Sequence, residues 1–476
     1  MGELAAHYEH SILSQPVMKA ASSLPDGPRM PVILRWMKFI FQPLEYVEDF
    51  AKTYGDNFTI WGRDNSHKVY FSHPQALQQI FTADSSQLEA GKGNTILKFL
   101  VGANSLLLLD GNSHQRQRQL LAPPFHGERM RAYGKTISEI AEQVSHTWEN
   151  GKPFSIHVSM QEITLRVILR VVFGFDEGSR LEEMRRLLAS LLDSMDSPLM
   201  FAALFLKFLQ KDLGAWSPWG RVVNLLQQID DTIYRLIRER RTESNPNRED
   251  VLSLMMCARD VNGETMTDEE LRDELMTLLV AGHETTAAAL TWAFYWIDRL
   301  PEVREKLQRE LDSLGDNLDS GAIAKLPYLT AVCQETLRIY PVAITASPRI
   351  VRSPIEIMGY NLPVGTIIFP SVYLAHHREE VYPQSKQFKP ERFLERQFSP
   401  YEYLPFGGGT HRCIGMAFAL YEMKLVLATV LSQFQLSSAN KRPARPVRRG
   451  LTLVPSEGMQ MVAKPIIKRV KAVANL

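Results

Sequence analysis

One cysteine lies in a setting that suits metal chemistry. Cys413 follows three consecutive glycines in the segment Phe406–Gly415, and a strongly helical apolar run, Ile414–Phe434, begins directly after it. Glycines let the backbone approach a ligand closely, and a helix N-terminus stabilises a thiolate. Apolar surroundings would raise the pKa of a bare thiol, so an anion here needs a metal as its partner. These features favour an axial haem ligand over the buried structural role that is usual for a lone cysteine.

A second set of polar residues interrupts a long helical pattern. Thr267–Glu270 has the form of a capping box, apolar residues then recur at helical spacing, and Pro301 ends the pattern. The pattern predicts a helix over Thr267–Leu300 that is ~50 Å long at 1.5 Å per residue. Within it, Ala281–Thr286 is a poor helix former. A threonine hydroxyl there can bond the carbonyl of the preceding turn and open a polar pocket, although a simple packing kink has the same pattern.

Two further pairs of charged or basic residues share helix faces. Glu335 and Arg338 stand three residues apart and can pair, most often as a weak surface ion pair. His114 and Arg118 stand four residues apart, so both point toward one anionic group unless they are simply solvated. Each pair is ambiguous on its own.

Taken together, these segments resemble the cytochrome P450 superfamily. The decapeptide Phe406–Gly415 resembles its haem-binding signature, although His411 replaces the usual arginine. Four motifs appear in the family's order between Asp110 and Gly415. The chain is most similar to the soluble cyanobacterial branch that is associated with fatty acids, alkanes and some terpenoids.

The resemblance implies a role for each matching residue. Cys413 is the thiolate ligand of haem b, Phe406 shields it, and Gly409 and Gly415 form the bulge and the helix start. The residues implied to bind the rest of the haem are His114, Arg118, Arg349, His411 and Ala281. Glu284 and Thr285 match the acid–alcohol pair of the oxygen groove, and Phe388–Phe393 supplies Arg392 to a structural triad with Glu335 and Arg338 that holds the cysteine loop.

The family also implies the fold. We expect a mainly α, triangular domain with a small β part, in which the haem lies between the long central helix and the cysteine loop. The predicted strands are Asn57–Trp61, Lys68–Phe71, Ile355–Ile357 and Ile367–Phe369, and the other predicted helices are Leu181–Leu192, Val222–Arg241 and Glu302–Leu311. Residues 1–24 read as a leader without a transmembrane helix, and 25–476 as one domain.

Composition agrees with this interpretation. The 476 residues carry 54 basic and 53 acidic side chains, a net charge of +1, with 45% hydrophobic residues. Such a balance excludes a disordered chain and broad phosphate neutralisation, so no nucleic-acid partner is expected. Cys257, Cys333 and Cys413 have no zinc-type spacing, which favours a reduced, cytoplasmic protein.

The resemblance implies a monooxygenase that splits O2 and inserts one oxygen atom into an unactivated C–H bond. No nucleotide-binding fingerprint appears, so electrons must come from a ferredoxin or flavodoxin with its reductase. We expect this donor to dock near Arg412, Arg116 and Lys424 on a monomeric enzyme. The rival interpretations are a peroxygenase, a hydroperoxide isomerase and a non-catalytic haem sensor, and the pair Glu284–Thr285 argues against all three.

Substrate recognition is expected to be apolar. The predicted lining residues are Leu97, Leu100, Val342, Ala343, Ile344 and Met459. An apolar patch, Leu199–Leu206, could belong to the core, to an apolar substrate entrance or to a surface that contacts a membrane peripherally. Burial of an alkyl chain at ~25 cal/mol per Å² favours long-chain fatty acids, with terpenoids or a broad aromatic range as the alternative.

Overall fold

The computed structural model describes residues 24–62, 67–125, 127–175, 178–195, 217–243, 248–315, 319–440, 442–450 and 452–466, together with residues 200, 203, 210 and 214. The predicted leader lies outside the described residues except for Leu24. The patch Leu199–Leu206 lies outside them except for Met200 and Ala203.

Helices dominate the described residues, as predicted. The α-helices are α1 Val32–Phe41, α2 Pro43–Tyr54, α3 Pro74–Thr82, α4 Lys98–Val101, α5 Gly111–Leu121, α6 Glu128–Ser145, α7 Ile156–Val171, α8 Ser179–Met195, α10 Pro218–Thr242, α11 Val251–Cys257, α12 Asp268–Arg299, α13 Pro301–Asp312, α14 Ser320–Ile323, α15 Pro327–Ile339, α16 Val372–His376, α17 Arg392–Glu395 and α18 Met416–Gln433. Short 3-10 helices are η1 Lys92–Leu97, η2 Pro123–Phe125, η4 Gly409–His411 and η5 Ser456–Gly458.

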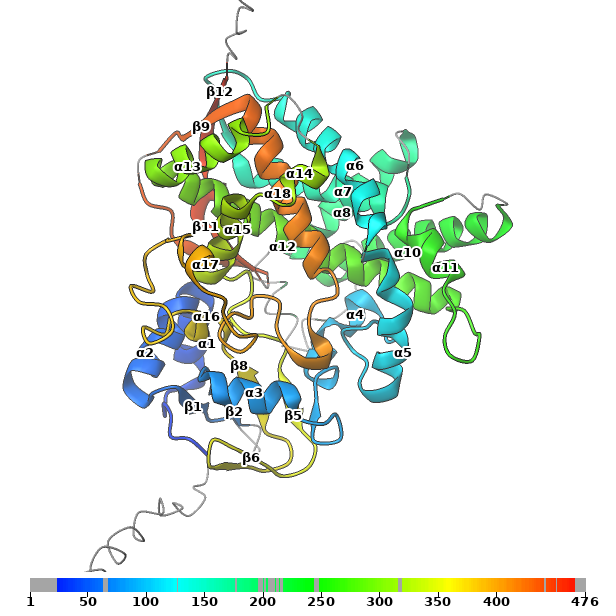
Figure 1. Cartoon of the computed structure of the whole chain (residues 1–476). Coiled ribbons are helices and arrows are strands. Elements are labelled where there is room, and N and C mark those ends of the chain that lie inside the picture. Colours follow the sequence, from blue (N-terminus) through cyan, green and yellow to red (C-terminus); the bar gives the residue numbers. More distant parts are fainter. Residues whose placement is uncertain are drawn as a thin grey trace, which may run out of the picture.

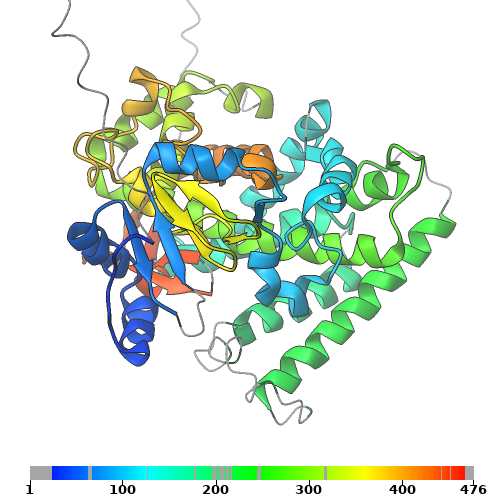
Figure 2. The ribbon, with the colours of Figure 1, turned by 90° about the horizontal axis from the view of Figure 1, so that it is seen from below.

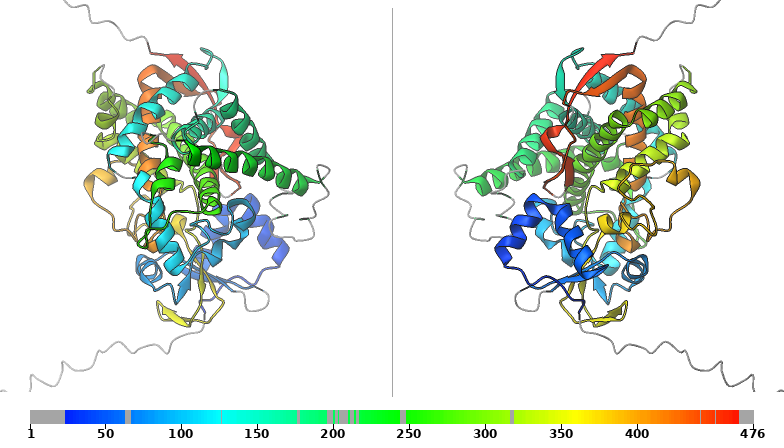
Figure 3. Two further views of the ribbon diagram at one scale, coloured as in Figure 1. Left: turned by 90° about the vertical axis from the view of Figure 1, so that its right-hand side faces the viewer. Right: turned by 90° about the vertical axis from the view of Figure 1, so that its left-hand side faces the viewer.

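The β part is small and lies mainly at one end of the molecule (Figures 1 and 3). The strands are β1 Asn57–Ile60, β2 Lys68–Phe71, β3 Leu88–Glu89, β4 Pro153–Ser155, β5 Arg349–Val351, β6 Ile355–Ile357, β7 Tyr360–Leu362, β8 Ile367–Pro370, β9 Phe434–Ser438, β10 Pro446–Arg449, β11 Thr452–Pro455 and β12 Gln460–Pro465. One sheet has the order β1-β2-β8-β5-β3, another has the order β4-β12-β9, and β6–β7 and β10–β11 are separate pairs. Helix α3 packs its apolar face on the larger sheet, where Leu77 and Ile80 meet Val69 and Ile368.

Helix α12 runs through the centre of the helical layer, behind α18 in Figure 1 and across the middle of Figure 2. Its 32 residues begin at the predicted capping box, in which Thr267 and Glu270 each bond the other's backbone N–H. It packs against α7, α18, α15 and α10, so most of its side chains are buried. The mainly α prediction and the long central helix are therefore confirmed.

Helix α18 follows the cysteine loop into the core. A segment that ends with it, Gly409–Gln433, is long and apolar enough to cross a bilayer, but 61% of its apolar window is buried inside the protein. It packs against α6, α12 and α15. Its apolar character is thus used in the core, which begins directly after Cys413.

Candidate active site

The glycines before Cys413 are required by the polypeptide itself. A Cβ atom on Gly408 would lie 2.6 Å from the Phe81 ring, and one on Gly409 would lie 2.4 Å from the Phe81 carbonyl oxygen. Gly409 also has a φ of +69°, a conformation that side chains disfavour. The Cys413 N–H closes the loop by donating to the Phe406 carbonyl at 3.0 Å.

The Cys413 thiol remains accessible, although protein surrounds it on most sides. Burial raises the pKa of this thiol, and the Gly415 N–H together with Arg118 and Arg412 only partly offsets that effect. Gly415 caps α18 with a φ of −84° and open space beside it. The chain itself does not require a glycine at 415, so that requirement would come from a ligand beside the thiol.

The other cysteines do not share these features. Cys333 is fully buried, and burial raises its pKa to about 12. Cys257 lies at the end of α11, far along the chain from any glycine loop. Only Cys413 combines an accessible thiol with a backbone that can approach a flat ligand.

Two guanidinium groups face the cysteine loop without an ion-pair partner among the described residues. Arg349 is 5% exposed and donates only to backbone carbonyls, among them that of Ser347 at 2.6 Å. Burial lowers its pKa to about 10. Arg118 donates to the Arg412 carbonyl at 2.7 Å. A buried positive charge needs an anion, so Arg349 fits a haem propionate. Half-buried Arg118, which has no carboxylate partner among the described residues, fits the second propionate.

Two histidines lie between these arginines. The rings of His114 and His411 stack with centroids 3.8 Å apart. Burial is the main cause that lowers the pKa of both imidazoles, and that of His114 falls to about 4. Both are therefore neutral near pH 7. His411 can form a hydrogen bond with an anion, whereas the usual arginine would form an ion pair.

Asp110 was not predicted as a site residue, yet it organises this corner. Its carboxylate accepts the N–H groups of Ala90 and Gly91 at 2.8 and 2.9 Å and lies 3.5 Å from Nε2 of His411. Burial opposes ionisation, but these partners outweigh it and lower the pKa of Asp110 to about 2. The position of Asp110 directly before α5 suggests a helix cap. No sequence signal indicates that Asp110 contacts His411.

The central helix turns an open face toward the interior. Ala281 is exposed and Thr285 is partly exposed, whereas His283, Thr286 and Ala287 are buried. Residues four apart share one helix face, so Ala281 and Thr285 form one accessible face of α12. The glycine loop, the accessible thiol and the unpaired guanidiniums fit a flat, dianionic haem beside it.

Thr285 and Glu284 use different partners. The Thr285 hydroxyl donates to the Ala281 carbonyl at 2.6 Å, as the sequence predicted. The Glu284 carboxylate turns to α7, where it accepts from Nε2 of Gln161 at 2.7 Å and lies 3.2 Å from Nε2 of His157. Burial would raise the pKa of Glu284, but His157 and Gln161 outweigh it and the pKa is lowered.

The structure brings the predicted triad together in the core. Arg338 donates two hydrogen bonds to Glu335, at 2.6 and 2.7 Å, and Arg392 donates a third at 3.2 Å. The remaining N–H groups of Arg338 bond the carbonyls of His376, Ser385 and Gln387. Every member is therefore paired, as a buried charge requires.

His376 connects this triad to the cysteine loop. Its Nδ1 lies 3.2 Å from the Arg338 carbonyl, and its Nε2 accepts the Leu404 N–H at 2.9 Å. Burial and Arg338 lower its pKa to about 3, so the ring stays neutral and keeps Nε2 as an acceptor. The contact holds the chain two residues before Phe406.

A short loop after α4 is tied to α12. The N–H and side-chain amide of Asn104 donate to Asp273 at 2.9 and 3.1 Å, and the Leu106 N–H donates to Glu274 at 2.8 Å. Gly102 has a φ of +87°, and a Cβ atom there would lie 1.8 Å from Asp273. The loop that follows Leu97 and Leu100, two of the predicted lining residues, is thus fixed to the central helix.

The predicted lining residues fall into two groups. Val342, Ile344 and Leu97 are partly exposed and Ala343 is exposed. Leu100 and Met459 instead lie in the largest core cluster, 6% and 5% exposed. These two residues therefore expose less apolar surface to a substrate than the first group does.

The three basic residues that were expected to meet an electron donor do not all leave their positive charge free at the surface. Arg116 pairs with Asp260 at 2.6 Å and with Glu270 at 2.7 Å, so its charge is neutralised. The Lys424 ammonium turns inward to the Ala324 carbonyl at 2.6 Å. Arg412 is exposed beside Cys413. Of the three, only Arg412 presents its charge at this surface.

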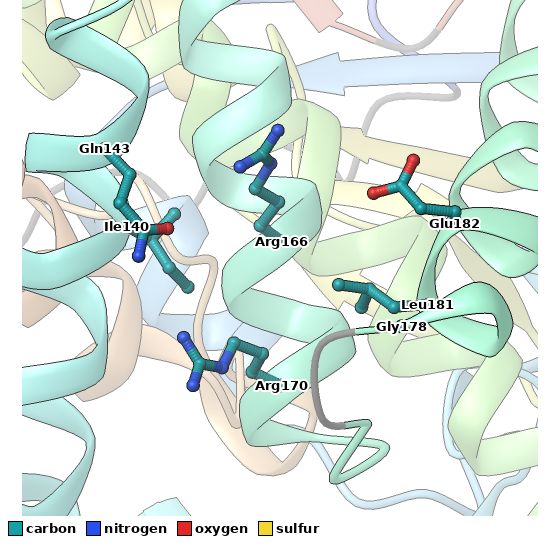
Figure 4. A pocket seen from close by; sticks show the side chains of 7 residues that line it. All are labelled: Ile140, Gln143, Arg166, Arg170, Gly178, Leu181 and Glu182. Atoms are coloured by element: carbon teal, nitrogen blue, oxygen red, sulfur yellow. The ribbon is translucent and has the colours of Figure 1, made fainter.

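A pocket of about 260 Å³ lies elsewhere, among α6, α7 and the start of α8 (Figure 4). Arg166 and Arg170 line it from one face of α7, whereas His157 and Gln161 reach α12 from the other face. None of the predicted site residues lines this pocket.

The comparisons define the class of protein. The family model described as Cytochrome P450 matches residues 25–462. The Mycobacterium tuberculosis protein named cytochrome P450 135B1 is 35% identical over 443 residues, which cover 93% of this chain and 92% of that relative. Cytochrome P450 138 of the same organism is 36% identical over 453 residues, covering 93% and 96%. The chain belongs to the cytochrome P450 family, as its sequence motifs indicated.

Solved structures agree on the fold. Retinoic acid-bound cyanobacterial CYP120A1 has a TM-score of 0.79 at 22% identity and covers 93% of this chain and 100% of its own. The cytochrome P450DA heme domain has a TM-score of 0.82 at 22% identity, covering 94% and 99%. The protein is therefore a haem-thiolate monooxygenase that binds haem b through a cysteine.

Proposed function

We propose that this monooxygenase hydroxylates long-chain fatty acids at a haem held by Cys413. The observation that carries the haem site is the accessible Cys413 thiol beside two guanidiniums, Arg118 and Arg349, without anionic partners among the described residues. Bound there, the haem supplies the activation of dioxygen, which a thiolate ligand favours.

The surrounding residues then take defined roles. Arg118 and Arg349 neutralise the propionates, and the neutral rings of His114 and His411 add hydrogen bonds. Phe406 would shield the Cys413 thiolate and Gly415 would leave room for the ring, whereas Gly409 shapes the loop against Phe81. With a haem in place, Glu284 and Thr285 would hold and move protons on the α12 side of the site, where the Thr285 hydroxyl lies next to exposed Ala281.

An apolar substrate is supported by the side chains left accessible after folding. Leu97, Val342, Ala343 and Ile344 keep exposed apolar surface, and covering it with an alkyl chain contributes ~25 cal/mol per Å². A terpenoid or aromatic substrate is the alternative. The cyanobacterial relative CYP120A1 is bound to retinoic acid, an apolar carboxylic acid built from terpenoid units.

Electrons come from a ferredoxin or flavodoxin with its reductase, and we place the donor's acidic surface over exposed Arg412. The enzyme acts as a monomer in the cytoplasm. Peripheral contact with a membrane is supported by α1, which exposes Leu34, Met37 and Phe41 along one side.

Two measurements test this function. In Cys413→Ser, the reduced carbon monoxide complex should lose the thiolate-type Soret band, while Cys257→Ser should keep it. An unchanged band in Cys413→Ser would remove Cys413 as the ligand.

For the wild type, medium- to long-chain fatty acids should shift the haem spin state and yield hydroxylated product only with reduced ferredoxin or flavodoxin. Retinoic acid and an aromatic panel are run in parallel. If only these give a shift and product, the fatty-acid assignment is wrong. Turnover with peroxide alone would instead support the peroxygenase.

A further inference from the structure

A buried polar cluster joins α7 to the middle of α12. His157 and His283 are both buried, and each ring faces a threonine across the helix contact. His157 also lies 3.2 Å from the Glu284 carboxylate, which the predicted proton relay uses. Gln161, one turn further along α7, holds the other carboxylate oxygen at 2.7 Å.

The hydroxyl partner of His157 fixes its tautomer. The Thr291 hydroxyl donates its single hydrogen to the Ala287 carbonyl at 2.7 Å. Its oxygen lies 3.1 Å from Nδ1 of His157, so it must accept there. Nδ1 of His157 therefore carries a hydrogen.

This tautomer leaves Nε2 facing the carboxylate. A neutral His157 with hydrogen on Nδ1 would direct the lone pair of Nε2 at Glu284 Oε1, an acceptor 3.2 Å away. Two facing acceptors in a buried contact are unfavourable. One proton must therefore lie between His157 and Glu284.

His283, the second buried histidine of this cluster, has surroundings that differ from those of His157. Its Nδ1 lies 2.9 Å from the Thr164 hydroxyl, which donates to the Met160 carbonyl. No carboxylate faces its ring within hydrogen-bond distance among the described residues, and burial lowers its pKa to about 4. His283 is thus a neutral packing histidine, although it lies next to Glu284 in the sequence.

We propose that His157 is a positioning residue that orients Glu284 and stores the proton which this carboxylate passes on. The proposal rests on the proton relay of the proposed function. It adds His157 as the group that supplies the proton to Glu284. In the step, the N–H bond at Nε2 breaks and an O–H bond forms at Glu284 Oε1, with no change in electron count. Glu284 then releases this proton on the Thr285 side, and a proton taken from bulk solvent restores the imidazolium before the next turnover.

The protonation state can be observed without turnover. Holoenzyme with ¹⁵N-labelled histidine, reduced and bound to carbon monoxide, is diamagnetic and suits nuclear magnetic resonance. In the wild type, both ring nitrogens of one buried histidine should carry hydrogen. In Glu284→Gln that same ring should lose the hydrogen from Nε2. Identical nitrogen signals in the two proteins would overturn the proposal, even if no His157 variant folds.

Turnover gives the second readout. In His157→Gln, the fraction of electrons that reaches product should fall about tenfold, with the remainder recovered as peroxide. The substrate-induced spin shift should be retained. His146→Gln, an exposed histidine after α6, is the matched control and should keep wild-type coupling.

Thr285→Ala separates this inference from the proposed function. If Thr285→Ala uncouples turnover and His157→Gln does not, the relay stands and the role of His157 is wrong. If Thr285→Ala also keeps full coupling, the relay itself fails.

Discussion

Two networks of buried ionisable side chains, one behind the cysteine loop and one on α12, are built differently. Behind the cysteine loop, Glu335 is bonded by Arg338 and Arg392, and both guanidiniums also reach backbone carbonyls. On α12, the carboxylates of Glu274 and Glu284 have no arginine partner among the described residues. They are held by a backbone N–H, an amide and a histidine.

The difference teaches what each network can do. The guanidiniums of Arg338 and Arg392 bond Glu335 and backbone carbonyls in fixed directions, so the first network holds geometry. Partners that are neutral or titratable allow Glu274 and Glu284 to exchange protons. The network behind the cysteine loop is therefore fixed, whereas the partners on α12 allow changes of protonation.

The sharpest way to test the fixed network is to remove its single negative charge. Glu335→Gln leaves two buried guanidiniums uncompensated and should destabilise the protein by about 3–5 kcal/mol. It should also lower haem content, because His376 transmits the network to Leu404 before the cysteine loop. Denaturant unfolding and haem absorbance measure both effects.

Glu162→Gln is the matched control for this experiment. Glu162 pairs with Arg166 and Arg185 on the partly exposed face of α7, and Arg166 is among the residues that line the pocket of Figure 4. Its loss should cost under about 1 kcal/mol. Equal effects of the two substitutions would contradict the comparison between a buried network and a surface pair.

Local sequence signals predicted the parts that depend on neighbours along the chain. The capping box at Thr267 set the start of α12, and the spacing of Glu335 and Arg338 set their pairing. Strands β2 and β6 begin and end where predicted, because short β-branched runs are bounded by turn residues.

Contacts between residues that lie far apart in the sequence could not be predicted from local sequence signals. Nothing near Glu284 in the sequence indicates His157, which lies over a hundred residues earlier and meets it only because α7 packs on α12. Arg116 and Lys424 were expected to be free surface charges, but Asp260, Glu270 and the Ala324 carbonyl engage them. Pairing between distant segments is decided by packing, which local pattern does not encode.

A medium effect is expected at the loop tied to α12. Gly102→Ala places a methyl group on Asp273 and strains a backbone with a φ of +87°. Gly263→Ala imposes similar strain at +81° but has open space. Gly102→Ala should therefore cost about 2 kcal/mol more than Gly263→Ala and weaken the substrate-induced spin shift. Equal stabilities would mean that the Asp273 tether contributes nothing.

The smallest expected effect is on how the free energy of unfolding changes with pH. Burial raises the pKa of Glu274 from 4.5 to about 8, so this carboxyl is neutral in the folded protein and ionised in the unfolded chain between these values. Unfolding then releases a proton, and rising pH favours the unfolded state by about 1.4 kcal/mol for each pH unit in this window.

Glu274→Gln keeps an acceptor for the Leu106 N–H but removes this contribution. Denaturant midpoints at pH 6 and 7 should therefore differ less in Glu274→Gln than in the wild type, whereas Glu269→Gln, an exposed neighbour, should keep the wild-type slope. Equal slopes in all three proteins would show that Glu274 is ionised in the folded state, and the contrast with the fixed Glu335 network would then fail at this residue.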